Sequence, residues 1–217
     1  MIIGVLALQG DFREHVKLLT ALGVDTVEVR LPQDLIGLDG LIIPGGESTT
    51  IGKMAKKYEL MDPLAEFARE HAIWGTCTGM IFMAKNIGVD QPLLGIMDIV
   101  VERNAFGRQL DSFVQEIDVP ALKDMPTHGG PATTDGPDSR FLAVFIRAPR
   151  LVSVDETAGV NILARLDDGT AVAAEQGHWL VTSFHPELTA DPRFHSYFLK
   201  LVKTALSASN PPAQSEA

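Results

Sequence analysis

The stretch Ile73-Trp74-Gly75-Thr76-Cys77-Thr78-Gly79-Met80-Ile81-Phe82-Met83-Ala84 decides the fold more than any other part of the sequence. It begins as a short apolar strand and continues as a helical run, with Cys77 between two glycines at the junction. A nucleophile in the pattern G-x-nucleophile-x-G is typical of a sharp elbow at the end of a parallel strand. The N-terminus of the following helix favours a thiolate there. A buried structural cysteine is the alternative interpretation.

Strand and helix patterns alternate through the first half of the chain. Residues 2–8 are continuously apolar, as in a strand that is buried on both faces. Residues 26–29 and 41–43 read as the second and third strands. Apolar residues recur at helical spacing over residues 12–19, and Asp62 followed by Pro63 predicts a helix start. This alternation predicts a mostly parallel central sheet with helices on both faces.

Strand patterns predominate in the second half, and short turns separate several of them, which predicts antiparallel additions to the main sheet. These segments are residues 94–101, 112–119, 141–146, 160–166, 171–175 and 179–184. Residues 194–206 return to a helical pattern. We therefore predict one three-layer α/β domain over residues 1–206 and a disordered tail over residues 207–217. Residues 123–140 match no regular element, and we interpret them as a dispensable exposed loop.

Composition excludes several classes of function. The chain has 217 residues, with 18 basic and 28 acidic side chains and a net charge of -10. This balance argues against binding to nucleic acid or to an anionic membrane. The apolar start lacks the basic region of a signal peptide, and no apolar stretch is long enough to span a bilayer. A single cysteine fits the reducing cytoplasm, where we expect the protein to be located.

One of the six histidines stands in a position suited to catalysis. His185 follows the apolar run 179–184 and precedes Pro186 and Glu187. In an extended chain, residues two apart point the same way, so Glu187 is placed to orient the His185 ring. We predict that Cys77, His185 and Glu187 act as nucleophile, base and orienting acid.

The other histidines have structural interpretations. His15 and His71 lie in helical patterns, where we expect solvated faces, and the rest lie in a loop, at a turn and at a helix start: His128, His178 and His195. Because the histidines are scattered and no Cys/His cluster exists, no metal is expected, and no cofactor is predicted.

A glycine pair follows the third predicted strand, in Pro44-Gly45-Gly46-Glu47-Ser48-Thr49. Adjacent glycines let backbone N–H groups approach a ligand closely. We predict an oxyanion hole from Gly45, Gly46 and Thr78. An ordinary strand-to-helix turn is the alternative. The glycine pair and the two catalytic segments all follow strands of one predicted sheet, and ligands of open α/β folds bind beyond those strand ends.

With these motifs assembled, the chain resembles the class I, triad-type glutamine amidotransferases. More narrowly, it is similar to the glutaminase subunits of pyridoxal 5'-phosphate synthase. The resemblance runs from residue 1 to about residue 205, and it rests on residues 4–10, 44–50, 101–109 and 145–149. The loop at residues 123–140 is longer than is usual in that family. The resemblance implies that L-glutamine contacts six residues: Gly46, Glu47, Ser48, Arg103, Ile146 and Arg147.

The resemblance also implies a reaction and a partner. Cys77 is expected to release ammonia from glutamine through a thioester, and the ammonia is expected to pass to a synthase subunit within a large hetero-oligomeric complex. Three alternatives stay open. They are a glutaminase subunit for another pathway such as imidazole glycerol phosphate synthesis, a cysteine peptidase on a similar elbow, and an inert binding module on the same fold.

Overall fold

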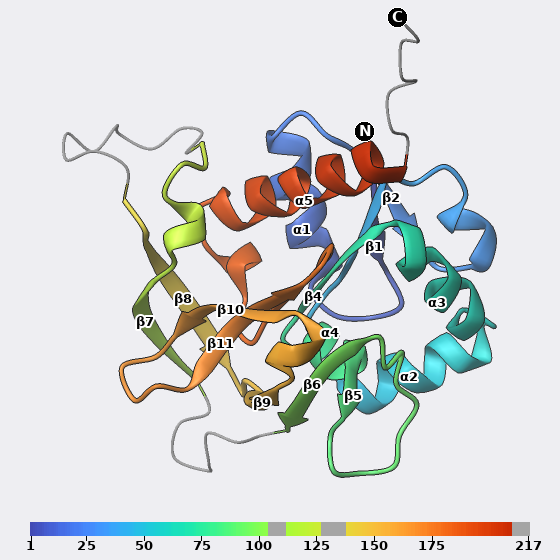
Figure 1. Ribbon diagram of the computed structural model, residues 1–217. Helices are drawn as coiled ribbons and strands as arrows, with labels where there is room; N and C mark the ends of the chain where they lie inside the picture. Colours follow the sequence, from blue (N-terminus) through green and yellow to red (C-terminus); the bar gives the residue numbers. More distant parts are fainter. Residues whose placement is uncertain (104–111, 127–137, 210–217) are drawn as a thin grey trace, which may run out of the picture.

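A central sheet between two layers of helices forms the body of the protein (Figure 1). The computed structural model describes residues 1–103, 112–126 and 138–209. Over these residues the main sheet has ten strands in the order β2-β1-β3-β4-β12-β11-β9-β6-β5, with β10 paired to β11. The predicted three-layer α/β architecture is confirmed.

Five neighbouring strands of this sheet are parallel. They are β1 (Ile2–Leu6), β2 (Asp25–Val29), β3 (Gly40–Ile43), β4 (Ala72–Thr76) and β12 (Trp179–Thr182). Their carboxyl ends lie at the same edge of the sheet, where ligands of open α/β folds bind. The predicted elbow, the glycine pair and His185 all follow strands of this group.

The antiparallel half of the sheet differs from the prediction in detail. It contains β6 (Met97–Glu102), β9 (Arg150–Val154), β10 (Val160–Arg165) and β11 (Ala171–Gln176), with the edge strand β5 (Ala84–Asn86) parallel to β6. The sequence did not reveal β5, which is only three residues long, or β9, which is largely exposed. Two predicted additions to the main sheet, β7 (Ser112–Asp118) and β8 (Arg140–Ile146), instead pair with each other as a separate sheet.

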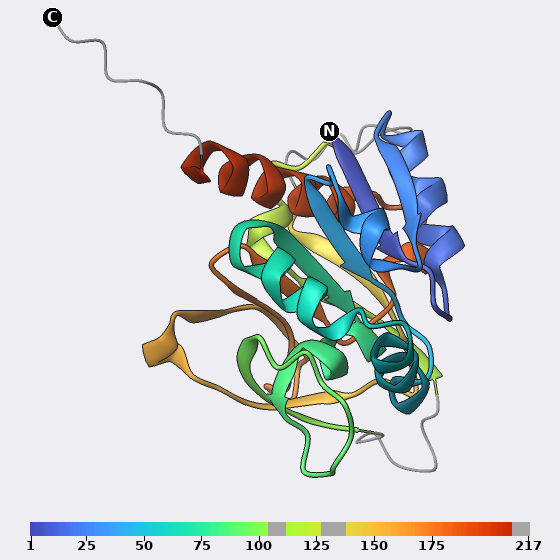
Figure 2. The same cartoon turned by 90° about the vertical axis from the view of Figure 1, so that its right-hand side faces the viewer.

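Helices cover both faces of the main sheet (Figures 1 and 2). On one face lie α1 (Phe12–Ala21) and α5 (Arg193–Ser209). On the other lie α2 (Ser48–Lys57), α3 (Met61–Glu70) and α4 (Thr78–Met83). Four short 3-10 turns complete the described chain: η1 (Pro32–Leu35), η2 (Pro120–Leu122), η3 (Glu156–Ala158) and η4 (Pro186–Leu188).

The two helical layers explain why the first strand is continuously apolar. Ile3 and Val5 pack in the same cluster as Phe194 of α5, whereas Leu6 packs in the opposite cluster with Ile51 of α2. Successive side chains of a strand point to opposite faces, so a strand covered on both faces needs an apolar residue at every position.

Two boundaries differ from the sequence-based expectation. Helix α3 begins at Met61 with Leu60 as its N-cap, so Asp62 lies in the first turn and makes no cap hydrogen bond. Helix α5 continues to Ser209, past the domain boundary predicted at residue 206. Most of the predicted loop, residues 127–137, and the remaining tail, residues 210–217, lie outside the described residues. Within the described ranges, no helix has the length and apolar character needed to cross a membrane.

Candidate active site

Cys77 occupies a strained turn between β4 and α4. Its backbone has φ 47° and ψ -100°, a conformation that residues other than glycine rarely adopt. Its N–H donates a 2.7 Å hydrogen bond to the carbonyl of Thr182 at the end of β12. A Cβ on Gly79 would lie 2.0 Å from the Ile43 carbonyl oxygen, and one on Gly75 would lie 2.5 Å from Gly79. The flanking glycines are therefore required by close packing, and the predicted elbow is confirmed.

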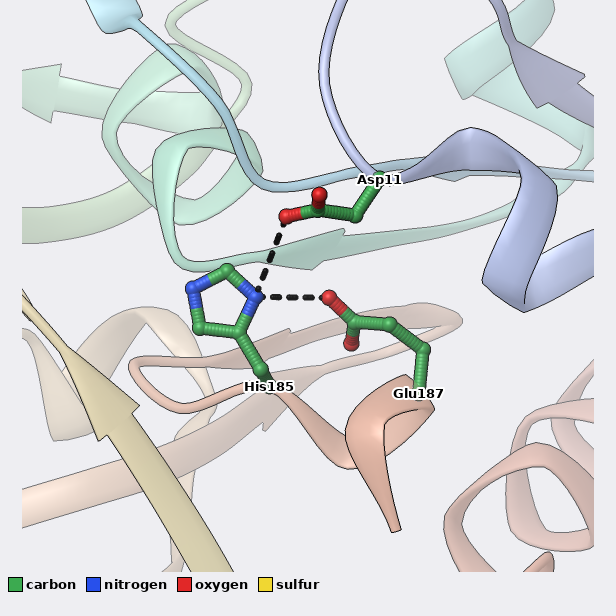
Figure 3. A group of neighbouring side chains, drawn as sticks. All are labelled: Asp11, His185 and Glu187. Carbon is green, nitrogen blue, oxygen red and sulfur yellow. Dashed lines mark hydrogen bonds and ion pairs between the residues drawn. The ribbon is translucent and has the colours of Figure 1, made fainter. Parts of the chain in front are cut away.

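The structure brings His185 and Glu187 together, as Figure 3 shows. Nδ1 of His185 lies 2.6 Å from Oε1 of Glu187, and the residues are only 4% and 5% exposed. The local geometry differs from the extended chain assumed in the sequence analysis, because Glu187 lies in the turn η4. The backbone N–H of His185 donates a hydrogen bond to the carbonyl of Val144 in β8, and this bond anchors the start of the turn.

The charges of this cluster are coupled. Burial lowers the pKa of His185, but its hydrogen bonds with Cys77 and Glu187 outweigh burial and raise that pKa to about 10. Burial raises the pKa of the Glu187 carboxyl, and the hydrogen bond from His185 opposes that rise. The Cys77 sulfur and the Glu187 carboxylate thus both favour the imidazolium form of His185, as expected of a base that takes the thiol proton.

Sequence reasoning missed a second carboxylate beside the ring, Asp11, which Figure 3 shows near the same ring nitrogen as Glu187. Its Oδ2 lies 3.6 Å from His185 Nδ1, and its side chain is 44% exposed. The available signal was the position of Asp11 shortly after the carboxyl end of β1, at the edge of the sheet where the other site residues lie. The ligand atoms of Asp11, His185 and Glu187 lie within 4.8 Å of one another. However, Nδ1 of His185 and Oε1 of Glu187 are 2.6 Å apart, which is a hydrogen-bond distance. Two ligand atoms of one tetrahedral zinc ion stand roughly 3.3 Å apart, so the spacing of this pair is that of a hydrogen bond.

The glycine pair lies directly against the ring of His185. A Cβ on Gly45 would lie 2.4 Å from Cε1 of His185. The Thr78 hydroxyl donates to the Gly46 carbonyl at 2.7 Å, and the Glu47 N–H donates to Oε1 of Gln9 at 3.0 Å. In this state the peptide between Gly46 and Glu47 presents its carbonyl oxygen to the elbow and directs its N–H away from it.

Two charged residues expected to contact glutamine, Glu47 and Arg103, lie beside each other next to the glycine pair. Glu47 caps α2 by accepting from the N–H groups of Thr49 and Thr50, at 3.0 and 2.6 Å. Burial raises the pKa of Glu47, but the hydrogen bond from the Thr50 hydroxyl and these two N–H groups together outweigh burial and lower that pKa to about 2, so Glu47 is an anion. Arg103 approaches Glu47, with 3.7 Å between Nη2 and Oε1. Its guanidinium is thus held beside a fixed negative charge.

The remaining expected contacts lie on the segments next to Cys77. The carbonyl oxygen of Ile146 lies 4.0 Å from Sγ of Cys77. Arg147 follows with an exposed side chain and a φ of 43°, which marks a second strained residue near the elbow. Ser48 is buried in the first turn of α2.

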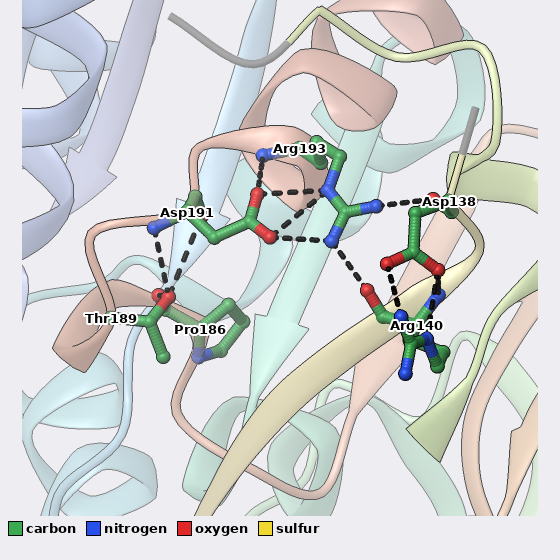
Figure 4. Close-up of polar contacts among 6 residues, drawn as sticks. All are labelled: Asp138, Arg140, Pro186, Thr189, Asp191 and Arg193. Atoms are coloured by element: carbon green, nitrogen blue, oxygen red, sulfur yellow. Dashed lines mark hydrogen bonds and ion pairs between the residues drawn. The ribbon is translucent and has the colours of Figure 1, made fainter. Parts of the chain in front are cut away.

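A clamp of polar contacts holds the segment that follows Glu187 (Figure 4). The Thr189 hydroxyl donates to the Pro186 carbonyl at 2.9 Å, and Nη2 of Arg193 lies 2.6 Å from Oδ2 of Asp191. The same guanidinium donates to two backbone carbonyl oxygens at the start of β8, those of Asp138 and Arg140. The segment that follows the Glu187 turn is thereby tied to the strand that carries Ile146.

Two of the histidines interpreted as structural proved to be buried beside the triad. His15 was expected on a solvated face, but His15 and His195 are both 0% exposed. The helical spacing of the sequence could have predicted this burial, because His15 lies three residues after Phe12 and four before Leu19, on the buried side of α1. His71 and His178 are half-buried and contact backbone carbonyls away from the triad.

This buried pair predicts a loss of stability in mild acid. Burial and, to a lesser extent, the neighbouring His195 and His185 hold the pKa of His15 well below its usual range, and burial lowers the pKa of His195 to about 3. The unfolded chain takes up protons at both residues near pH 6.5, whereas the folded protein does not. Stability is therefore complete above that pH and falls as pH decreases, by about 1.4 kcal/mol per pH unit for each histidine.

Urea unfolding at about pH 7 and about pH 5.5 measures this slope. His195→Gln keeps a donor in place of Nε2 but cannot titrate, so its unfolding free energy should fall less steeply than that of the wild type. Identical slopes would show that His195 does not contribute.

Comparison with known proteins agrees with this geometry. A sequence model of the SNO glutamine amidotransferase family matches residues 5–204. The chain is 52% identical over 206 residues to the pyridoxal 5'-phosphate synthase subunit PdxT of Herpetosiphon aurantiacus, a match that covers 93% of this chain and 100% of the relative. It is 48% identical to PdxT of Geobacillus kaustophilus, over 97% of this chain and 99% of the relative.

Solved structures give the same result. A crystal structure of a glutamine amidotransferase superposes with a TM-score of 0.82 at 46% identity, covering 94% of this chain and 100% of the other. On the family match, the two relatives and this structure, the chain belongs to the SNO glutamine amidotransferase family.

Proposed function

We propose that the chain hydrolyses L-glutamine to L-glutamate and ammonia as the glutaminase subunit of pyridoxal 5'-phosphate synthase. The observation that carries this proposal is the strained elbow of Cys77 beside the hydrogen-bonded pair of His185 and Glu187. Family membership and the PdxT relatives support the same activity.

The triad suits acyl transfer from an amide. His185 takes the proton of the Cys77 thiol, and Sγ attacks the side-chain amide carbon of glutamine. The C–N bond breaks as His185 returns the proton to the leaving ammonia. Water that His185 deprotonates then attacks the glutamyl thioester, which releases glutamate and restores the thiol. Glu187 holds the ring and stabilises the imidazolium in each step.

Charges near the elbow match the two ends of glutamine. The ionised Glu47 carboxylate suits the α-ammonium group, and an arginine suits the α-carboxylate, which it can bind with two parallel hydrogen bonds. Arg103 and Arg147 are the candidates. The backbone of Gly46, the Ser48 segment and Ile146 would complete the contacts.

The partner we propose is the synthase subunit, which takes up the released ammonia within a large hetero-oligomeric complex in the cytoplasm. The PdxT relatives are named as a subunit of pyridoxal 5'-phosphate synthase, and this name implies a synthase partner. If the chain instead served imidazole glycerol phosphate synthesis, its activity would respond to that synthase. A cysteine peptidase would cleave peptides, and an inert module would release no ammonia from glutamine.

We expect the isolated chain to be a poor glutaminase that the synthase activates. The Glu47 N–H is held by Gln9 and the Gly46 carbonyl by Thr78, so this peptide donates nothing toward Cys77. Turning the peptide over would supply a donor for the oxyanion hole beside Gly45 and the Thr78 N–H. One oxyanion-hole donor is worth roughly 10²–10³ in rate. A synthase that binds the turned state more tightly would shift the population toward it.

Steady-state ammonia release by the purified chain, alone and with saturating synthase, tests both the function and the activation. We expect a rise of roughly 10²-fold or more with the synthase. The Cys77→Ala chain with synthase is the control for contaminating glutaminase. Equal rates in the two conditions would mean that the hole is already formed without the partner.

A further inference from the structure

A buried pair of histidines lies directly behind the triad carboxylate. Nε2 of His15, on α1, lies 3.4 Å from Oε2 of Glu187, the oxygen that does not face His185. Nδ1 of His15 lies 3.0 Å from Nε2 of His195, on α5. Trp74 packs edge-on against both rings, with centroids 5.5 and 4.9 Å away. This enclosure keeps the two rings in fixed positions away from water.

The hydrogen-bond pattern assigns a proton to each ring. Nδ1 of His195 is buried and has no hydrogen-bond partner among the residues that the structure describes. A buried N–H without an acceptor is rarer than a buried lone pair without a donor, so the proton of neutral His195 lies on Nε2. It is donated to Nδ1 of His15. Neutral His15 therefore carries its own proton on Nε2.

The Nε2 proton of His15 has two acceptors within reach. One is the hydroxyl of Thr76, at 3.3 Å, and the other is Oε2 of Glu187. Oε2 is buried and has no hydrogen-bond partner within the described residues, so in this state the Nε2 hydrogen bond of His15 goes to Thr76, and Oε2 is only closely approached by the ring. A buried carboxylate oxygen without a donor is costly, and the ring nitrogen placed to supply one is Nε2 of His15.

We infer that His15, with its proton placed by His195, is a positioning residue that directs a second N–H at the Glu187 carboxylate and keeps it ionised and aimed at His185. This inference rests on the proposed glutaminase function. The titratable groups that face Glu187 are His185, His15 and Asp11, and those that face His15 are His195, His185 and Glu187. Burial holds the pKa values of both buried histidines low, which keeps the donor chain neutral at physiological pH.

Two substitutions of His15 distinguish the effect of its Nε2 donor from the effect of side-chain volume. The side-chain amide of His15→Gln reaches the place of Nε2 and keeps a donor toward Glu187. The shorter amide of His15→Asn reaches only the place of Nδ1. With saturating synthase, we expect His15→Asn to lower kcat by about 10- to 100-fold, with KM for glutamine unchanged because His15 lies behind the triad. His15→Gln should recover most of that loss.

The pH dependence of kcat/KM distinguishes a positioning role of His15 from a merely structural role, which would not shift it. Without the second donor, the pKa of Glu187 rises, so the acidic limb of kcat/KM should move to higher pH in His15→Asn and not in His15→Gln. His178→Asn is the matched control, because the His178 ring contacts the Ala68 carbonyl and Trp179, away from the triad. It should keep the wild-type rate and limb.

The outcomes are distinguishable. An inactive wild type with synthase would refute the proposed function itself. An active wild type with a wild-type rate and limb in folded His15→Asn would overturn this inference, as would equal losses in the Asn and Gln variants. If His15→Asn does not fold, as judged by circular dichroism, His195→Asn carries the test. It removes the donor to His15, and an unmoved acidic limb in that variant would overturn the inference.

Discussion

Cys77→Ala should abolish glutamine hydrolysis and leave the fold intact. The substitution removes only Sγ, because alanine keeps the Cβ and so adds no strain at φ 47°. Without the sulfur no thioester forms, and loss of a nucleophile from a catalytic triad costs about 10⁶ in kcat. The measurement is ammonia release with saturating synthase, together with the thermal unfolding midpoint, which should stay near the wild-type value.

The single thiol of this chain makes the assignment direct. A glutamine analogue with an electrophilic side chain should add to the wild-type chain once, and mass spectrometry should find the label on Cys77. Cys77→Ala should take no label. Hydrolysis near the wild-type rate in this variant would mean that the elbow positions something other than the nucleophile.

The parts of the fold that the sequence predicts are those with a strong local signal. A strand covered on both faces must be apolar at every position, so β1 could be recognised from residues 2–8 alone. The elbow needs glycines because backbone and helix meet there, and that requirement is visible in Gly75 and Gly79. The separate pairing of β7 with β8 has no such signal, because strand patterns do not specify which strand is the neighbour.

The residues of the candidate active site also fall into those that the sequence predicts and those that it does not. Cys77 and His185 each follow a strand of the parallel group, and their meeting follows from the topology of the sheet. Asp11 and His15 come from the segment after β1 and reach His185 and Glu187 only through tertiary packing. His15 also looks like an ordinary helical residue, because a neutral buried histidine and an apolar side chain occupy the same face.

Glu187→Gln should lower kcat severely, by about 10⁴ as for the comparable aspartate of a protease triad. Glutamine has nearly the same volume and can fill the buried site, so the fold should survive. It has no charge, and its amide can present either an oxygen or an N–H to Nδ1 of His185. The imidazolium loses its stabilisation, and part of the population holds the wrong tautomer. His185→Ala should be more severe, since it removes the base itself.

Asp11→Asn is the matched control for Glu187→Gln, because both carboxylates face the same ring nitrogen. Oε1 of Glu187 lies 2.6 Å from Nδ1, whereas Oδ2 of Asp11 lies at 3.6 Å on a side chain that is 44% exposed. A longer contact screened by water contributes less, so we expect a loss of about 10-fold or less for Asp11→Asn. Steady-state glutaminase kinetics with saturating synthase measure both variants. If Asp11→Asn proves the more damaging of the two, Asp11 rather than Glu187 is the acid that orients His185.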